Sequence, residues 1–307
     1  MLSLLLASWL TLVELNCENL FDCRHDSLKQ DTEWLPEGAR QWTPARYWRK
    51  LNNIGQELLS CMDDGLPDLV ALVEIENDSV ARDLTRRSLL RNAGYEYLMT
   101  ESPDVRGIDV ALLYQPLTFR PLCYDCLEIE PLEGMRPTRD ILYVQGETRG
   151  GDTLHVFVVH APSRFGGERQ TRPNRMLVAR RLADAIGALP PRAGVVVAGD
   201  FNDYADSPAL QYLEQCGLHN IGRDAKGRNG QAEGTYRYQG EWESIDHILV
   251  SGRLLDSVEQ CYINDSPFLL EEEKKYGGAR PLRTYNGYRY QRGFSDHLPL
   301  VARFRLP

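Results

Sequence analysis

Short apolar runs recur along the whole chain, and polar residues follow each of them. Runs of this length that are rich in Val, Ile and Leu predict buried β-strands. We expect strands at residues 10–16, 67–75, 108–114, 140–146, 153–160, 194–200, 244–250 and 299–306.

Segments with apolar residues at helical spacing lie between these strands. Residues 43–62 begin with Thr43 and Pro44, which suit the start of a helix, and residues 78–93, 175–189 and 207–216 follow a similar pattern. No Pro/Gly/Ser-rich linker and no internal repeat divides the chain. The pattern therefore predicts one α/β domain over residues 1–307, with two sheets packed face to face and helices outside. Two polar segments, residues 222–243 and 271–293, are expected to be long surface loops.

Polar side chains of chemical interest lie at the ends of many predicted strands. Taken singly, an Asn or Asp at a strand end is most often a turn former, and a His beside an apolar run is most often a hydrogen-bonded structural residue. Taken as a set, they predict an acidic pocket where several strand ends meet. Their oxygen donors suit Mg²⁺, Mn²⁺ or Ca²⁺ better than zinc. The set consists of Asn16, Glu74, His160, Asp200, Asn202, Asp246, Asp296 and His297.

The formal net charge of the 307-residue chain is -9, with 35 Lys and Arg against 44 Asp and Glu. This balance argues against nonspecific coating of DNA, which needs a basic surface. It leaves room for an enzyme that acts on a phosphodiester, because a bound divalent cation can supply local positive charge.

The seven cysteines form no disulfide framework, since their number is odd and their spacing irregular. Cys123 and Cys126 have C-x-x-C spacing but no second pair at zinc spacing, so reduced thiols and a reducing compartment such as the cytoplasm are favoured. The apolar start leaves two alternatives open. Residues 1–9 are either the remnant of an export signal or an N-terminal extension that leads into the first strand. No apolar run reaches the length of a membrane span, so we expect no stable membrane insertion, and nothing implies a protein partner.

An ordered series of motifs resembles the endonuclease/exonuclease/phosphatase superfamily, whose fold is that of deoxyribonuclease I. The motifs run through nearly the whole chain: "LNCENLFD", "LVEIEN", "RGIDVALLY", "VVHAPSR", "AGDFND", "SIDHILVS" and "FSDHLPL". "RDILYV" and "PSRFGGE" further resemble a bacterial branch of that superfamily. The resemblance implies a four-layer α/β sandwich of two mixed sheets flanked by helices, with the active site at one rim.

The same resemblance implies hydrolysis of a phosphoester by metal-activated water. Glu74 would be the principal Mg²⁺ ligand, with Asn16 and Asp296 nearby, and Mn²⁺ or Ca²⁺ are alternatives. Asp200 would orient or deprotonate the attacking water, and Asn202 would hold a phosphate oxygen.

Two histidines complete the implied catalytic set. His297 would face the scissile phosphate, and His160 matches the second histidine of the deoxyribonuclease I and sphingomyelinase branches. Asp246 would fix one imidazole and its tautomer. Negative charge develops on the phosphate oxygens during attack, so cationic or neutral donors must meet it.

Four further residues carry weaker expectations. Arg139 matches a phosphate-contacting arginine position of the deoxyribonuclease I branch, and Arg164 is a second candidate for that role. Glu18 is expected near the metal in a supporting role. Asp109 either braces His160, or is a turn residue, or pairs with Arg106.

The expected substrate is a phosphodiester, with a nucleic acid or nucleotide placed first. Residues 235–242 and 283–293 place Tyr and Arg side by side, which suits base stacking and phosphate binding. The alternative is that these tyrosines only pack the loops onto the core. A phosphatase or phosphodiesterase for a small phosphorylated molecule, an inositol phosphate or a lipid headgroup is the second expectation, and an inactive binding module is the third.

Overall fold

The computed structural model describes residues 8–306, and its first sheet has six strands. Residues 1–9 were expected to be either an export-signal remnant or an N-terminal extension. Residues 1–7 of this segment lie outside the described residues, and Ser8 and Trp9 belong to the first strand. The order across this sheet is β13 (Val258–Ile263), β18 (Leu300–Leu306), β1 (Ser8–Leu20), β2 (Leu69–Ile75), β4 (Asp109–Tyr114) and β3 (Glu96–Met99).

The second sheet also has six strands and, like the first, combines parallel and antiparallel neighbours. Its order is β5 (Phe119–Leu127), β6 (Ile141–Thr148), β7 (Thr153–His160), β8 (Gly194–Asp200), β12 (Asp246–Ser251) and β9 (Leu218–Asn220). The parallel pairs are β1 with β2 and β7 with β8. A strand corresponds to each of the eight predicted segments, whereas β3, β5, β9 and β13 were not predicted. The pattern misses β5 and β13 because these edge strands are largely exposed and lack a continuous apolar run.

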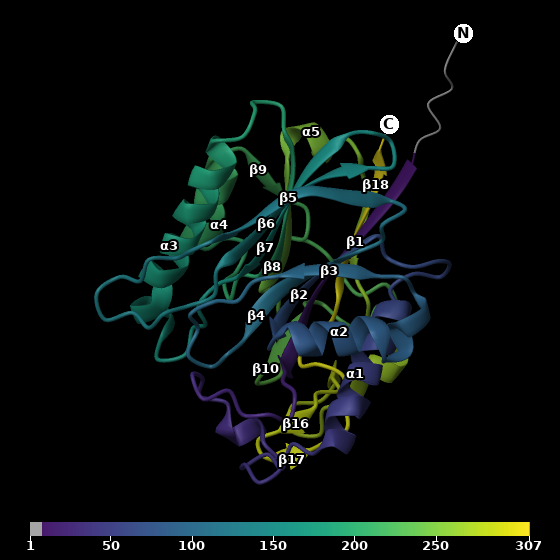
Figure 1. The fold of residues 1–307 in the computed structure, drawn as a ribbon, viewed down its shortest axis with the longest axis vertical. Coiled ribbons are helices and arrows are strands. Elements are labelled where there is room, and N and C mark those ends of the chain that lie inside the picture. Colours follow the sequence, from purple (N-terminus) through teal and green to yellow (C-terminus); the bar gives the residue numbers. More distant parts are fainter. Residues whose placement is uncertain (1–7, 307) are drawn as a thin grey trace.

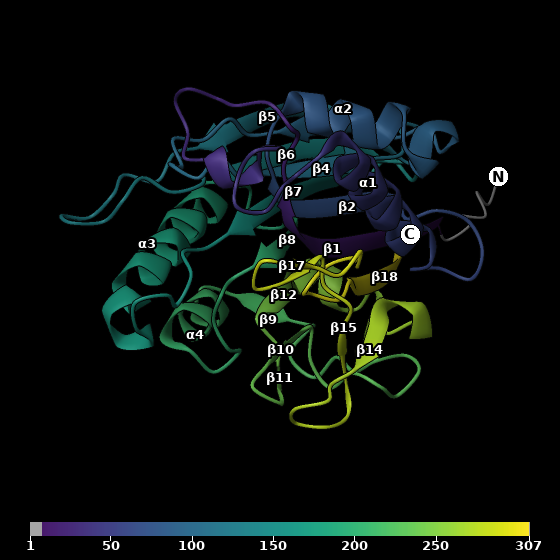
Figure 2. The ribbon, with the colours of Figure 1, turned by 90° about the horizontal axis from the view of Figure 1, so that it is seen from below.

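The chain forms four layers because both faces of each sheet are apolar. Leu12, Val73, Val158 and Ile248 belong to the cluster between the two sheets. Alternate residues such as Val13 point to the opposite face, where helices cover them. Helices α1 (Pro44–Leu59) and α2 (Asp78–Arg86) lie on the first sheet, and α3 (Glu168–Gly187) and α4 (Pro208–Gln215) lie on the second (Figures 1 and 2). The predicted four-layer sandwich is confirmed.

The helix ends differ from the prediction in two places. Residues 78–93 divide into α2 and a 3₁₀ turn at Leu89–Asn92, because the Ser88 hydroxyl accepts a bond from the Leu90 amide and starts a new turn. Helix α3 begins at Glu168 rather than at residue 175, so Pro173 lies inside it without ending it. The remaining short elements are 3₁₀ turns at Thr32–Trp34 and Pro267–Leu269 and the helix α5 (Gly252–Leu255).

The two segments expected as surface loops contain small hairpins. The first holds β10 (Tyr236–Tyr238) and β11 (Glu241–Glu243). The second holds β15 (Ala279–Pro281), which pairs with β14 (Leu270–Glu272), and the hairpin of β16 (Tyr285–Asn286) and β17 (Arg289–Tyr290). Among the described residues, no helix combines the length and the apolar character that crossing a bilayer requires.

Candidate active site

Three adjacent strands of the second sheet end in the same row of polar residues. His160 lies opposite Asp200 in the β7–β8 pair, and Asp200 lies opposite Asp246 in the β8–β12 pair. Gly199 precedes Asp200 where β8 approaches β7 closely, since a Cβ atom there would lie 1.8 Å from the Val159 carbonyl oxygen. Only glycine fits this position, so the "AGD" sequence is part of how β8 delivers Asp200 to the rim.

The first sheet contributes the opposite wall. Asn16 lies in β1, Glu74 lies next to the end of the parallel strand β2, and Asp296 and His297 come just before β18. Because β18 runs antiparallel to β1, its beginning lies at the same edge of the sheet as the end of β1. The Asn16 side-chain amide donates to Oδ2 of Asp200 at 3.0 Å and links the two walls.

These residues meet around a cavity of about 500 Å³. Eight of the predicted site residues line it: Asn16, Glu74, His160, Arg164, Asp200, Asn202, Asp296 and His297. A larger hollow of about 1240 Å³ lies near Ala183, Cys216 and Gly252, but none of its described lining residues is a carboxylate or a histidine. The chemistry therefore belongs to the smaller cavity.

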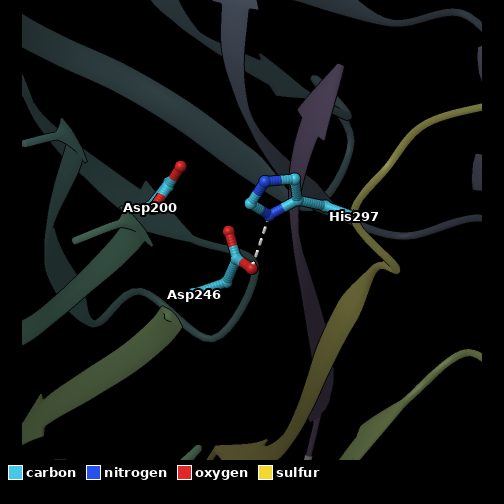
Figure 3. A group of neighbouring side chains, drawn as sticks. All are labelled: Asp200, Asp246 and His297. Atoms are coloured by element: carbon cyan, nitrogen blue, oxygen red, sulfur yellow. Dashed lines mark hydrogen bonds and ion pairs between the residues drawn. The ribbon is translucent and has the colours of Figure 1, made fainter. Parts of the chain in front are cut away.

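His297 is held by the buried Asp246, and Figure 3 shows the bond between the two side chains. The Nδ1 atom of His297 is 2.8 Å from Oδ2 of Asp246, and the Thr235 hydroxyl donates to the same oxygen. The ring of Tyr236 packs against the imidazole with a centroid distance of 4.8 Å. Burial alone would lower the pKa of His297, but the carboxylates of Asp246 and Asp200 outweigh it and raise this pKa well above its ordinary value. His297 is therefore fixed in orientation and carries a proton at neutral pH.

His160 has a different environment from His297. Its Nε2 atom lies 3.7 Å from Oδ2 of Asp200 and 3.9 Å from Oε1 of Glu74. Burial, together with the charges of Arg139 and Arg106, holds the pKa of His160 well below its ordinary value. The pKa values of the two imidazoles are thus shifted in opposite directions, which favours a neutral His160 and a protonated His297.

Of the three alternatives for Asp109, its hydrogen bonds support the turn residue. Asp109 accepts hydrogen bonds from the hydroxyl groups of Thr100 and Ser102 and from the Ser102 amide. It therefore organises the turn that precedes β4. The Nδ1 atom of His160 is buried and has no hydrogen-bond partner among the described residues.

Asp200 lies at the centre of the site. Burial and the nearby charge of Asp246 raise its pKa to about 7. Its Oδ1 atom accepts a hydrogen bond from the backbone N–H of Asn202 at 2.7 Å. The side-chain amide of Asn202 donates to the Ala161 carbonyl oxygen at 3.1 Å. Asp200 therefore suits the transfer of a proton near neutral pH.

Glu74 and its neighbours have an unusual backbone. Glu74, Asn19 and Asn202 line the cavity with φ angles of 62°, 57° and 50°, in the left-handed region that side chains with a Cβ atom seldom adopt. Oε2 of Glu74 accepts from the Asn19 amide at 2.8 Å, and Oε1 lies 3.6 Å from the Arg106 guanidinium. Such strain persists where the surrounding structure enforces it, and it is concentrated at functional sites. Neither Asn19 nor Arg106 was predicted from the sequence to belong to the site.

Asp296 is neutralised by Arg283, which was likewise not predicted as a site residue. Arg283 donates to Oδ2 of Asp296 at 2.7 Å. Burial would raise the pKa of Asp296, but the Arg283 charge outweighs it and lowers this pKa. The position of Arg283 in the Tyr- and Arg-rich segment before "FSDH" was the only sequence signal for this contact.

Glu18 supports the site from behind the cavity. Its carboxylate accepts from the backbone amides of Thr284 and Tyr285, and Lys50 lies 3.8 Å away. The buried Lys50 ammonium in turn donates to the Thr284 hydroxyl at 2.7 Å and to the Phe294 carbonyl oxygen. Both charged groups therefore anchor the segment that carries Arg283 and Asp296.

The two arginines expected to bind phosphate are engaged by the protein itself. Arg139 is buried and donates to Asp104 at 3.2 Å and to the Ala161 carbonyl oxygen at 3.0 Å. It lies behind the described wall of the cavity, which does not support direct contact with a phosphate. Arg164 does line the cavity, but it forms an ion pair with Glu243 and packs over Tyr204 at 4.6 Å.

The donor set fits a divalent cation. Ligand atoms of Asp200, Asp246 and His297 lie within 4.8 Å of one another. The carboxylates of Glu74 and Asp296 and the Asn16 amide also line the cavity and offer oxygen atoms, the kind of ligand that a hard cation prefers. Burial and, after it, the charge of Asp246 raise the pKa of Asp200, and a bound cation would offset the second effect.

The comparisons with known structures agree with this architecture. An endonuclease/exonuclease/phosphatase family protein from Bacteroides thetaiotaomicron has a TM-score of 0.66 at 15% identity, over 98% of this chain and 99% of that chain. A mannosyl-6-phosphatase from the same species has a TM-score of 0.64 at 15% identity, over 95% and 98%. The human nocturnin catalytic domain, with a bound sulfate anion, has a TM-score of 0.58 at 17% identity, over 98% of each chain. At these identities the similarity concerns the fold.

No curated protein matches the sequence significantly. The family model described as "Endonuclease/Exonuclease/phosphatase family" matches residues 11–305, which include every element from β1 to β18 except a few terminal residues. The chain therefore belongs to the endonuclease/exonuclease/phosphatase family.

Proposed function

We propose that this chain is a divalent-metal-dependent phosphoesterase that uses water as the nucleophile. The observation that carries the proposal is the meeting of oxygen donors and two histidines of opposite protonation around one cavity. Glu74, Asn16 and Asp296 would hold the cation, which would supply positive charge to the phosphate and lower the pKa of bound water.

The residues of the chain account for the remaining steps. Asp200 accepts the proton of the attacking water, since its pKa near 7 leaves a substantial carboxylate fraction at neutral pH. As the water oxygen bonds to phosphorus, the P–O bond to the leaving group breaks; the imidazolium of His297 stabilises the charge that develops and gives its proton to the leaving oxygen, and Asp246 keeps its ring in place. The neutral His160 donates or accepts a hydrogen bond on the opposite side, and Asn202 contributes a further polar contact from the cavity wall.

The charges around the cavity favour a small phosphorylated substrate, such as a nucleotide. Besides His297, the cationic side chains among the described lining residues are Arg106 and Arg164, and Glu243 neutralises Arg164. A nucleic acid backbone needs a row of cations, and the net charge of -9 does not provide a basic surface. Cleavage of nucleic acid is the second candidate, and it is favoured by Tyr238, an exposed aromatic side chain at the cavity that could stack on a base.

Two assays with Mg²⁺ or Mn²⁺ test the proposal. Phosphate release from nucleotides, sugar phosphates and inositol phosphates is measured beside the nicking of supercoiled plasmid. We expect phosphate release or nicking that chelation by EDTA abolishes and that Asp200→Ala lowers at least a hundredfold. Asp206→Ala is the matched control, because this exposed carboxylate lies on the loop that follows. Full activity in Asp200→Ala, or in EDTA, would contradict the mechanism.

A further inference from the structure

Two exposed aromatic side chains border the catalytic cavity. Phe165 and Tyr238 both line it, with 93% and 54% of their surface exposed. A large aromatic side chain is normally buried for most of its surface, so a phenylalanine left in solvent beside a reaction site calls for a reason. Neither side chain is needed for the proposed hydrolytic chemistry.

The loop between β7 and α3 holds Phe165 at this rim. The Phe165 amide donates to the Ser163 hydroxyl at 3.3 Å, and the Gly167 amide donates to the Arg164 carbonyl oxygen at 3.0 Å to close a tight turn. Gly166 follows with φ 91°, a conformation that favours glycine. The loop is thus shaped by its own hydrogen bonds, while the Phe165 ring remains free of the core.

Arg164 joins this loop to the hairpin that carries Tyr238. Its guanidinium pairs with Glu243 of β11, and Tyr238 belongs to the partner strand β10. Arg164 therefore connects the loop of Phe165 to the hairpin of Tyr238 and holds both side chains at the same cavity. This connecting role explains the position of Arg164 at the cavity better than phosphate binding does. Within β10, Tyr236 and Tyr238 share one face because side chains alternate along a strand, and Tyr236 contacts His297. Tyr238, two residues further along β10, therefore lies on the same face as Tyr236 but further from the His297 imidazole.

The charges at this outer part of the cavity select the kind of group that it would bind. Glu168 and Glu243 line it, and each is paired with an arginine, Glu168 with Arg172 and Glu243 with Arg164. A second phosphate or a carboxylate would therefore have to compete with these carboxylates for a cation. An uncharged, planar group would instead gain contact with the aromatic faces.

We propose that Phe165 and Tyr238 form an aromatic subsite that binds an uncharged aromatic ring carried by the substrate next to its phosphate. This inference rests on the proposed function for the position of the phosphate. A phenyl ring attached directly to the phosphate and a nucleobase attached through a sugar share this chemistry, and the experiment separates them.

Binding of phosphonates that cannot be hydrolysed tests the subsite without turnover. Calorimetric titrations with Mg²⁺ compare methylphosphonate, phenylphosphonate and the 5′-methylenephosphonate of thymidine. We expect at least one of the two aromatic ligands to bind about tenfold more tightly than methylphosphonate, as stacking predicts. The aromatic ligand that gains more identifies how the ring is attached. Equal affinity for all three ligands would overturn the proposal.

Substitutions assign any such preference to the two rings. Phe165→Ala and Tyr238→Ala should each weaken the aromatic ligand about threefold to tenfold and leave methylphosphonate unchanged, whereas Phe165→Trp should retain the preference. Tyr124→Ala is the matched control, since Tyr124 is 55% exposed on β5 and does not line the cavity. A preference that survives the double substitution would refute the subsite. Intact aromatic preference without hydrolysis of any phosphoester would instead count against the proposed function alone.

Discussion

Asn16 of β1 donates a hydrogen bond from Nδ2 to Oδ2 of Asp200 of β8 at 3.0 Å, across 184 positions of sequence. The bond connects the two sheets at the point where the proposed chemistry takes place. Asn16 also accepts the Glu18 amide at 2.9 Å, so its side chain is fixed from both sides. The orientation of the Asp200 carboxylate therefore depends on the packing of the sheets against each other.

Replacing Asn16 should impair catalysis more than folding. We expect Asn16→Ala to lower kcat about tenfold or more, because Asp200 loses a donor that orients it. Steady-state kinetics and urea unfolding measure the two effects. Asn92→Ala, at an exposed position, should leave kcat unchanged. An unchanged kcat in Asn16→Ala would show that the bond has no catalytic role.

Asp246 acts through His297 rather than on the substrate. Asp246→Asn should lower kcat by about a hundredfold to ten-thousandfold, because the imidazole loses the carboxylate that orients it and keeps it protonated. Kinetics of the variant, together with circular dichroism to verify the fold, test this. Asp125→Asn on the exposed face of β5 is the control. If Asp246→Asn retains wild-type kcat, His297 does not depend on this pair.

Arg106 presents a partly exposed cation at the cavity. Its side chain is 45% exposed, lies 3.6 Å from Glu74 and donates to the Asn19 side chain. We expect Arg106→Ala to raise KM about tenfold, because a cation near the phosphate would be lost. Arg149→Ala, an exposed arginine on the loop after β6, should have no such effect. A variant with normal KM would place the phosphate away from Arg106.

Lys50 neutralises Glu18 in the interior. Lys50→Met should lower the free energy of unfolding by about 3 kcal/mol, since Glu18 would remain buried without its cation. It should also lower kcat, because Lys50 anchors the segment that carries Asp296. Urea unfolding and kinetics measure both changes, with the exposed Lys226→Met as control. A variant as stable as the wild type would show that Glu18 is protonated and needs no partner.

Glu57 of α1 should make stability depend on pH. Burial raises its pKa to about 8, and both carboxyl oxygens lack hydrogen-bond partners among the described residues. The folded chain keeps a proton that the unfolded chain loses above about pH 4.3, so the free energy of unfolding falls as pH rises from there to about 8. Glu57→Gln should remove this fall.

Urea unfolding at pH 5 and pH 8 tests the role of Glu57. The free energy of unfolding of Glu57→Gln, relative to that of the wild type, should increase by a few kcal/mol from pH 5 to pH 8. Glu37→Gln, at an exposed position, should follow the wild type at both. A constant difference between wild type and Glu57→Gln would mean that Glu57 titrates alike in the folded and unfolded chains.

The sequence by itself determined the buried strands, the four-layer arrangement and the family. Burial of a strand on both faces requires a continuous apolar run, and the runs that end at Asn16, His160 and Asp200 are visible without coordinates. A carboxylate or imidazole directly after such a run has a fixed place at the rim of a sheet. The main members of the site could therefore be named from local pattern and ordered motifs.

Only the tertiary structure decided how charges pair. Arg164 binds Glu243, Arg283 binds Asp296, Lys50 supports Glu18, and Asp109 binds Ser102. Long side chains on loops can reach many partners, and the choice among them depends on how strands from distant parts of the chain pack together. The same packing gives two histidines opposite protonation, because desolvation and neighbouring charge, rather than residue type, set each pKa.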